Sequence, residues 1–216
     1  MLHLLESTPS IANRYVAEMR SLDVQNDRLR FRRNMERLGE CIAYEISKTL
    51  DFKDETVTTP LGESTTPVPA DDIVLATILR AGLPLHQGLL NVFDDAGNAF
   101  VSAYRKHHKD GTFEIAVEYL SCPDLTDKVL IVCDPMLATG ASMVLATQAL
   151  LRYGQPKSIH FVAAIAAAQG LEYLQRHFSK GHIWLGALDE ELTAKSYIVP
   201  GLGDAGDLSY GAKLQE

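Results

Sequence analysis

Cysteine and long apolar runs are scarce in this chain of 216 residues, and each shortage excludes a class of protein. The three cysteines are odd in number and too widely spaced for a zinc knuckle, which argues against a disulfide-stabilised secreted domain. The longest near-continuous apolar run, Ile159–Ala168, is far shorter than a membrane span of about 20 residues. The N-terminus also lacks the basic start of a signal peptide. We therefore expect a protein of the cytoplasm that has no membrane partner.

Basic residues are also few. Only 20 lysines and arginines stand against 28 aspartates and glutamates, which gives a net charge of −8. This balance argues against binding to nucleic acid through bulk positive charge, although a site for one small anion needs only a few well-placed groups. The 46% apolar and 22% charged residues are ordinary for a globular protein, and the length predicts a single domain over residues 1–216.

Residues 1–50 have the pattern of helices. Thr8 followed by Pro9 predicts a helix start, because proline is favoured at the first helical position. Apolar residues three and four positions apart then predict one buried helix face, made of Phe31, Met35, Leu38, Ile42 and Ile46. The other face carries arginines 28, 30, 32, 33 and 37, interpreted as a solvated or subunit-contact face. This helical arm favours a homodimer or a higher homo-oligomer.

After residue 57 short apolar runs alternate with helical segments. The predicted strands cover residues 73–79, 99–104, 128–133, 158–166 and 182–188. The predicted helices cover residues 83–92, 142–153 and 171–178. The alternating residues 112–120 predict an exposed arm or hairpin. This order predicts an α/β protein with a parallel sheet flanked by helices, and such sheets bind ligands beyond the carboxyl ends of their strands.

The segment Asp134–Ser142, called here the phosphate loop, follows the predicted apolar strand Val129–Cys133. Asp134 would stand at the carboxyl end of the strand, where its carboxylate can accept hydrogen bonds from vicinal hydroxyls. The small residues after it open a helix, whose free amides and dipole favour a phosphate. A carboxylate for a diol just before a phosphate site indicates ribose 5-phosphate. The other interpretation, an ordinary strand–helix connection capped by Ser142, stays open.

Two arginines are candidates for binding an anion. Arg80 ends a predicted apolar strand and is followed by Ala81 and Gly82, which leaves it without an evident structural role. Arg105, taken alone, fits a structural role as well as a functional one. A planar guanidinium suits the oxygens of phosphate groups.

Four segments together resemble a known family. The phosphate loop resembles the phosphoribosyl pyrophosphate loop of type I phosphoribosyltransferases, in the form found in uracil phosphoribosyltransferases. The segment Ile78-Leu-Arg-Ala-Gly82 is similar to the pyrophosphate loop of that family, and Tyr104-Arg105 to its second pyrophosphate-contacting arginine. The segment from Tyr197 to Asp207 resembles its uracil-binding loop. The resemblance implies the family fold: a parallel sheet flanked by helices, an N-terminal helical arm, a protruding β-arm and a base-binding loop over residues 189–216.

The resemblance implies transfer of ribose 5-phosphate from phosphoribosyl pyrophosphate to N1 of uracil, a salvage reaction that yields UMP and pyrophosphate. It implies catalytic roles for Asp134, Arg80 and Arg105. Asp204 would lie near a Mg²⁺ ion on the pyrophosphate, and GTP is a candidate effector. The implied donor-binding residues are Arg80, Arg105, Asp134, Pro135, Met136, Leu137, Ala138, Thr139, Gly140, Ala141, Ser142 and Asp204, and the implied uracil-binding residues are Ile198, Gly203, Asp204 and Ala205.

The chain departs from the family pattern at three places. Ala141 replaces the second glycine of the phosphate loop, Leu208 replaces a basic residue, and residues 106–118 form an unusual arm. Two other functions stay open: a regulatory homologue that senses the donor without turnover, and a phosphoribosyltransferase for another base. Purine-using relatives generally have two adjacent acidic residues before the loop, whereas Pro135 follows Asp134 here. A function in RNA binding would depend on the arginine-bearing helix, and the net charge of −8 argues against it.

Overall fold

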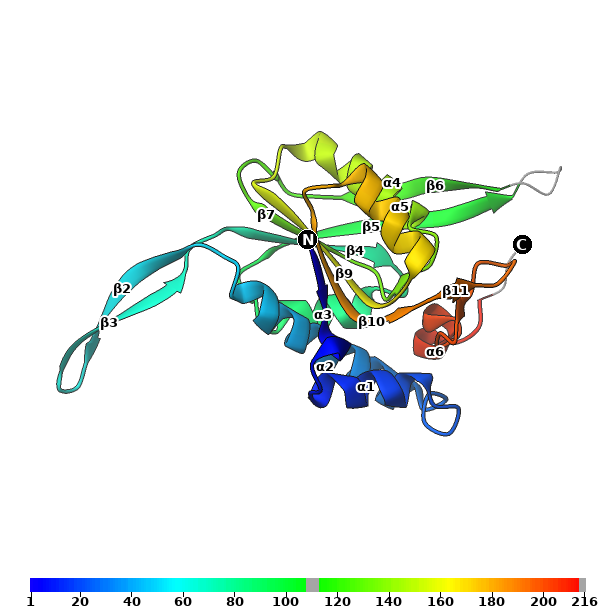
Figure 1. Ribbon diagram of the computed structural model, residues 1–216. Helices are drawn as coiled ribbons and strands as arrows, with labels where there is room; N and C mark the ends of the chain where they lie inside the picture. Colours follow the sequence, from blue (N-terminus) through cyan, green and yellow to red (C-terminus); the bar gives the residue numbers. More distant parts are fainter. Residues whose placement is uncertain (108–112, 214–216) are drawn as a thin grey trace.

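The computed structural model describes residues 1–107 and 113–213, with the side chains of 103–107 and 113–117 left out. Its centre is an eight-stranded sheet in the order β1-β10-β9-β7-β4-β5-β6, with the short β8 also paired to β9 (Figure 1). All neighbours in it are parallel except β5 and β6. The strands are β1 Leu2–Leu4, β4 Ile73–Leu79, β5 Gly97–His107, β6 Phe113–Ser121, β7 Val129–Cys133, β8 Met136–Leu137, β9 Ser158–Ala167 and β10 His182–Asp189. The prediction of a mainly parallel α/β sheet is confirmed.

Helices cover both faces of the sheet. On one face lie α1 (Ile11–Arg20), α2 (Arg28–Ser47) and α3 (Leu83–Leu90), and on the other lie α4 (Ala141–Leu150) and α5 (Ala168–His177) (Figure 1). Alternate residues of β7 point into the two cores, since side chains along a strand point to opposite faces. This double burial explains why β7 is apolar throughout. Short helical turns lie at Leu5–Ser7 and Leu151–Tyr153, and α6 covers Ala205–Tyr210.

The N-terminal segment differs from the prediction in two ways. Leu2–Leu4 forms β1, an edge strand that pairs with β10, so residues 1–50 are not helical throughout. The first helix is capped by Ser10, whose hydroxyl accepts a hydrogen bond from the Ala12 amide, and Pro9 lies before the cap rather than inside the helix. Pairing with the sheet edge decided the conformation of this short apolar segment. The predicted apolar face of α2 is confirmed as buried.

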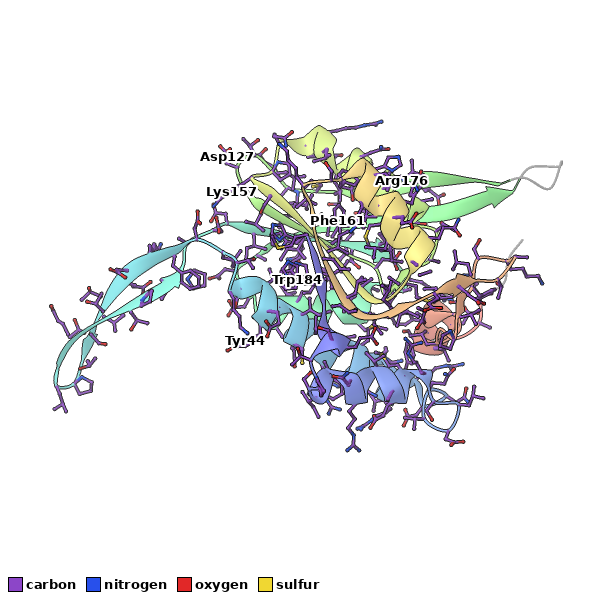
Figure 2. All side chains as sticks on the ribbon, viewed as in Figure 1. Tyr44, Asp127, Lys157, Phe161, Arg176 and Trp184 are labelled. Carbon is purple, nitrogen blue, oxygen red and sulfur yellow. The ribbon has the colours of Figure 1, made fainter. Side chains whose placement is uncertain are left out.

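The structure contains the predicted hairpin around residues 112–120 and a second hairpin that was not predicted. Strands β2 (Phe52–Thr59) and β3 (Gly62–Pro69) form an exposed antiparallel hairpin that extends away from the sheet (Figure 1). Residues 113–120, part of the predicted exposed arm or hairpin, belong to β6, which pairs antiparallel with the preceding strand β5 at the sheet edge and projects beyond the other strands (Figure 1). This prediction is confirmed. At the base of the β2–β3 hairpin, Lys157 (Figure 2) forms ion pairs with Asp51 and Asp71.

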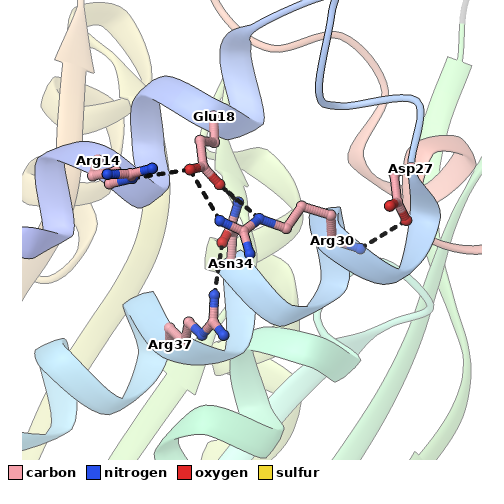
Figure 3. A network of polar contacts seen from close by, with 6 residues as sticks. All are labelled: Arg14, Glu18, Asp27, Arg30, Asn34 and Arg37. Atoms are coloured by element: carbon pink, nitrogen blue, oxygen red, sulfur yellow. Dashed lines mark hydrogen bonds and ion pairs between the residues drawn. The ribbon is translucent and has the colours of Figure 1, made fainter.

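A polar network fixes α1 against α2 (Figure 3). The carboxylate of Glu18 accepts hydrogen bonds from Arg30 Nε at 2.8 Å, Asn34 Nδ2 at 2.8 Å and Arg14 Nε at 3.1 Å. These donors lower the pKa of Glu18 to about 2. Asp27 caps α2 by accepting from the Arg30 amide. Part of the arginine face of α2 therefore serves contacts within the chain.

Stacked aromatic rings fill the region where β1, β10 and β9 adjoin. His3 stacks on Trp184 with ring centroids 3.7 Å apart, and His182 stacks on His160 at 4.7 Å. Trp184, labelled in Figure 2, donates from Nε1 to Nδ1 of His160 at 3.1 Å. Burial, followed by the charges of His182 and His3, lowers the pKa of His160 to about 3.

Two further observations concern the cysteines and the helices. Cys41, Cys122 and Cys133 are all free thiols. Over residues 1–107 and 113–213, no helix is long and apolar enough to cross a membrane.

Candidate functional site

The site lies where two adjacent strands send their connections to opposite faces of the sheet. Strands β4 and β7 are parallel neighbours, with Thr77 opposite Cys133. The connection after β4 leads into α3 on one face, and the connection after β7 leads into α4 on the other. Such a point leaves a crevice at the carboxyl ends of the strands, which is where open α/β sheets bind ligands. The structure therefore brings the Arg80 turn and the phosphate loop to one edge.

The phosphate loop is held rigidly by two glycines. Gly140 has φ +80° and immediately precedes α4, and a Cβ there would lie 2.8 Å from the carbonyl oxygen of Gly170. In turn, a Cβ on Gly170 would lie 2.2 Å from the carbonyl oxygen of Ala138. The loop thus packs closely against the start of α5. It presents the first amides of α4, where the helix dipole favours an anion.

The hydroxyls and amides of the phosphate loop are arranged around the start of α4. Ala141, which departs from the family pattern, is the first residue of α4, and its amide donates to Thr139 Oγ1 at 3.4 Å. The neighbouring segment Met136–Leu137 forms β8 and pairs with β9, which fixes the middle of the loop. Ser142 lies in the first turn of α4, so the capping position belongs to Gly140 instead.

Asp134 directly follows the end of β7, as predicted, and is half-buried there. Its amide donates to the Val162 carbonyl at 3.1 Å, which holds the backbone against β9. Desolvation raises the pKa of the Asp134 carboxyl to about 7, although a hydrogen bond from the Met136 amide opposes the shift. A carboxylate that loses hydration in this way is stabilised by hydroxyl donors or by positive charge placed beside it, and such groups are typical of functional sites.

Arg80 lies on the turn after β4 and contacts the C-terminal segment. Its guanidinium donates from one nitrogen to Asp207 Oδ1 and to the Gly211 carbonyl, both at 2.8 Å. A Cβ on Gly206 would lie 3.8 Å from Arg80 Nε, so the two segments adjoin closely. Asp207 is the last residue of the segment that resembles the uracil-binding loop, but no pattern in the sequence predicted a role for it. Its contact with Arg80 arises only from the tertiary fold.

Asp204 caps the helix α6 and therefore has one carboxylate oxygen engaged. Its Oδ1 accepts from the amides of Gly206 and Asp207 at 2.9 and 3.0 Å, while Oδ2 lies 3.5 Å from Lys213 Nζ. In the described part of the chain, no group of three or more His, Cys, Asp or Glu could hold a metal. The residues present fit a Mg²⁺ ion that is held mainly by phosphates and water, with one carboxylate at most.

The base-binding loop is shaped by tight turns. Strands β11 (Glu191–Leu192) and β12 (Ile198–Val199) pair antiparallel and bring the loop back toward the sheet. Gly201 has φ +61°, and a Cβ there would lie 2.1 Å from the Ile198 carbonyl oxygen. Gly203, with φ +94°, is exposed, whereas Ile198 and Ala205 are buried. The loop therefore exposes backbone groups around Gly203.

The sequence did not single out the ion pair that supports this loop. Arg20, at the end of α1, donates from its two terminal nitrogens to the two carboxylate oxygens of Asp189, both at 2.8 Å. The only signal in the sequence was the position of Asp189, just after a predicted strand. Nothing local pointed to Arg20, which is far away along the chain.

Arg105 is placed only in part. Its backbone lies in β5, the neighbour of β4, but its side chain is outside the described residues. A cavity of about 670 Å³ lies between α2, α3, β5 and α6, lined among others by Arg32, Phe100 and Tyr210. None of the predicted site residues lines that cavity.

Comparison with known proteins shows which family the chain belongs to. The sequence model described as uracil phosphoribosyltransferase matches residues 7–212. The chain belongs to the uracil phosphoribosyltransferase family. A uracil phosphoribosyltransferase of Porphyromonas gingivalis is 58% identical over 206 residues, covering 95% of both chains. One of Pyrococcus furiosus is 37% identical over 217 residues, covering 99% of this chain and 91% of the relative.

A solved structure supports the family fold. The AQ2163 protein of Aquifex aeolicus superposes with a TM-score of 0.88 at 31% identity, covering 100% of each chain. The fold class, predicted from the alternation of strands and helices, and the family, predicted from motifs, are thus confirmed.

Proposed function

We propose that this chain transfers ribose 5-phosphate from phosphoribosyl pyrophosphate to N1 of uracil, forming UMP and releasing pyrophosphate. Family membership supports this reaction. The observation that carries it is the joint placement of the Asp134 carboxyl, the amides that open α4 and the Arg80 turn at the ends of β4 and β7. Each of these groups suits one part of the donor: the carboxyl suits its vicinal hydroxyls, the amides its 5-phosphate and Arg80 its pyrophosphate.

The proposed mechanism depends on position and charge. Breaking the bond between C1 and pyrophosphate builds positive charge on the ribose ring and negative charge on the leaving group. Asp134 accepts hydrogen bonds from the ribose hydroxyls and faces the positive charge, while Arg80 and Arg105 bind the departing anion. The amides of the phosphate loop hold the 5-phosphate. Asp204 Oδ2 would help to hold a Mg²⁺ ion through water, and such an ion, when bound, would supply positive charge to the pyrophosphate.

Uracil would be recognised through its acceptor–donor–acceptor edge. Backbone groups at Ile198, Gly203 and Ala205 are the proposed partners. Cytosine reverses one donor and one acceptor, and each unpaired buried polar group costs about 1–3 kcal/mol. Two mismatches cost roughly 2–6 kcal/mol, a factor of about 30 to 20,000 against cytosine.

The test is an assay of the purified chain with donor, Mg²⁺ and one base at a time: uracil, cytosine or hypoxanthine. We expect UMP and pyrophosphate with uracil and at least about 30-fold less turnover with cytosine. Comparable turnover of both pyrimidines would contradict recognition by the backbone. A sensor without catalysis would show thermal stabilisation by the donor and no pyrophosphate release.

We also propose a homodimer or a larger homo-oligomer. The exposed hairpin β2–β3, which has Leu61 fully exposed at its tip, supports this, because such a strand pair is more stable when a partner covers it. Light scattering during gel filtration measures the assembly. The cytoplasm remains the proposed location, in keeping with three free thiols, and GTP stays a predicted effector to be tested by its effect on the rate.

A further inference from the structure

We propose that Arg20 and Asp189 are positioning residues for the base: together they fix the backbone of Gly201 and thereby set the affinity and selectivity for uracil. This inference rests on the proposed function. It concerns Arg20 at the end of α1 and Asp189 at the end of β10, neither of which is among the residues implied to bind substrate.

The two side chains and Gly201 form a closed set of hydrogen bonds. One terminal nitrogen of Arg20 donates to Asp189 Oδ2 at 2.8 Å and to the Gly201 carbonyl at 3.0 Å. The other nitrogen donates to Asp189 Oδ1 at 2.8 Å. Asp189 Oδ2 also accepts from the Gly201 amide at 3.0 Å. Both polar groups of the Gly201 backbone are therefore held by one ion pair.

Gly201 is the point at which such a restraint controls the loop. It lies between Ile198 and Gly203, two of the proposed uracil contacts, and adopts a left-handed φ of +61°. Glycine adopts positive φ without steric cost and has no side chain to restrict its backbone, so the position of this turn depends on the groups that hold it. Small rotations at Gly201 would move the groups on either side of it, so the ion pair determines where the backbone meets the base.

The ion pair is sheltered from water. The Asp189 side chain is 7% exposed and the Arg20 side chain 21%. Gln25 adds a brace, because its amide nitrogen donates to the Arg20 carbonyl at 3.0 Å and so fixes the end of α1. A charge-assisted, two-pronged pair in such a setting is geometrically specific, and lysine cannot reproduce it.

Glu18 offers a matched control on the same helix. It is an acidic residue held by several donors, but its partners all lie on α1 and α2 and none belongs to the base-binding loop. Glu18→Gln therefore weakens the packing of α1 without releasing Gly201. It separates general destabilisation from loss of positioning.

The experiment compares the wild type, Arg20→Lys, Asp189→Asn and Glu18→Gln by steady-state kinetics, with uracil and donor varied separately and cytosine as the rival base. Thermal unfolding of each variant is measured in parallel. We expect Arg20→Lys and Asp189→Asn to raise KM for uracil at least about tenfold and to reduce the preference over cytosine, as expected when a charge-assisted hydrogen bond is lost. KM for the donor should change less than about threefold, and Glu18→Gln should lower the unfolding temperature while leaving both KM values within about twofold.

The outcomes separate the inference from the function. A wild type that forms no UMP would contradict the proposed function itself. If the wild type is active and Arg20→Lys lowers only stability, with KM for uracil and the base preference unchanged, the positioning role is wrong. A parallel rise in KM for uracil and for donor in all three variants would likewise overturn it.

Discussion

Replacing Asp134 by asparagine should slow the enzyme and stabilise the free protein at the same time. The asparagine has nearly the same shape but carries no charge. Because desolvation raises the pKa of the Asp134 carboxyl from 3.8 to about 7, the folded free protein ionises this group at a cost that the unfolded chain does not bear. In the proposed mechanism, the same charge faces the developing cation of the ribose.

The size of the stability effect follows from the two pKa values. The folded state keeps a proton that the unfolded chain releases above pH 3.8, so stability is lost as the pH rises from about 4 to 7. One pKa unit corresponds to about 1.4 kcal/mol, which gives at most about 4 kcal/mol above pH 7. Asp134→Asn removes this cost. Its gain over the wild type should be near zero at pH 4, should grow up to pH 7 and should then stay level.

The assay has two parts. Urea unfolding of the ligand-free wild type and the Asp134→Asn variant at pH 4, 5.5, 7 and 8.5 gives the difference in free energy of unfolding. Turnover with donor, Mg²⁺ and uracil at pH 8 gives the catalytic effect, which we expect to be a loss of at least about tenfold, or about 1.4 kcal/mol in the barrier.

Either part can refute the reasoning. An unchanged rate would show that the charge of Asp134 plays no part in the reaction. A stability difference that does not vary with pH would show that the carboxyl is not desolvated in the folded protein.

Two other predictions concern stability and donor binding. His160 should destabilise the fold in acid: its pKa falls from 6.5 to about 3 on folding, so stability is lost as the pH drops below 6.5, by about 2 kcal/mol at pH 5. Asn at this position can still accept from Trp184, and urea unfolding of His160→Asn at pH 5 and 7.5 should show less acid sensitivity than the wild type; equal sensitivity would contradict the assignment. Gly140→Ala should cost about 1–3 kcal/mol and weaken donor binding, because the added Cβ meets the Gly170 carbonyl and φ is positive. Calorimetric titration with the donor measures this against Ala141→Gly, which should bind nearly as the wild type does.

The sheet was predictable because its strands are buried on both faces. Residues 73–79 were predicted as a strand with the bounds that β4 has, and the apolar run before Asp134 could hardly form anything but a central strand. The phosphate loop and the base-binding loop were recognisable from local residue order. Family membership followed from those motifs.

The remaining features depend on contacts that no local pattern records. Leu2–Leu4 is a strand only because the edge of β10 is available to it. The hairpin β2–β3 has few apolar residues and is exposed almost throughout, so hydrophobic alternation could not reveal it. The Arg20–Asp189 pair joins distant parts of the chain.

The contact between Arg80 and Asp207 also bears on product release. In the free protein this arginine already has an anionic neighbour, and both side chains are more than a third exposed, Arg80 at 40% and Asp207 at 35%. Solvent weakens such a pair to about 1 kcal/mol or less. In the proposed mechanism, the incoming pyrophosphate group would therefore displace the carboxylate at a cost of no more than about fivefold in affinity. When pyrophosphate departs, Asp207 would take its place at once. The guanidinium would thus be kept oriented between turnovers without strong competition against the substrate.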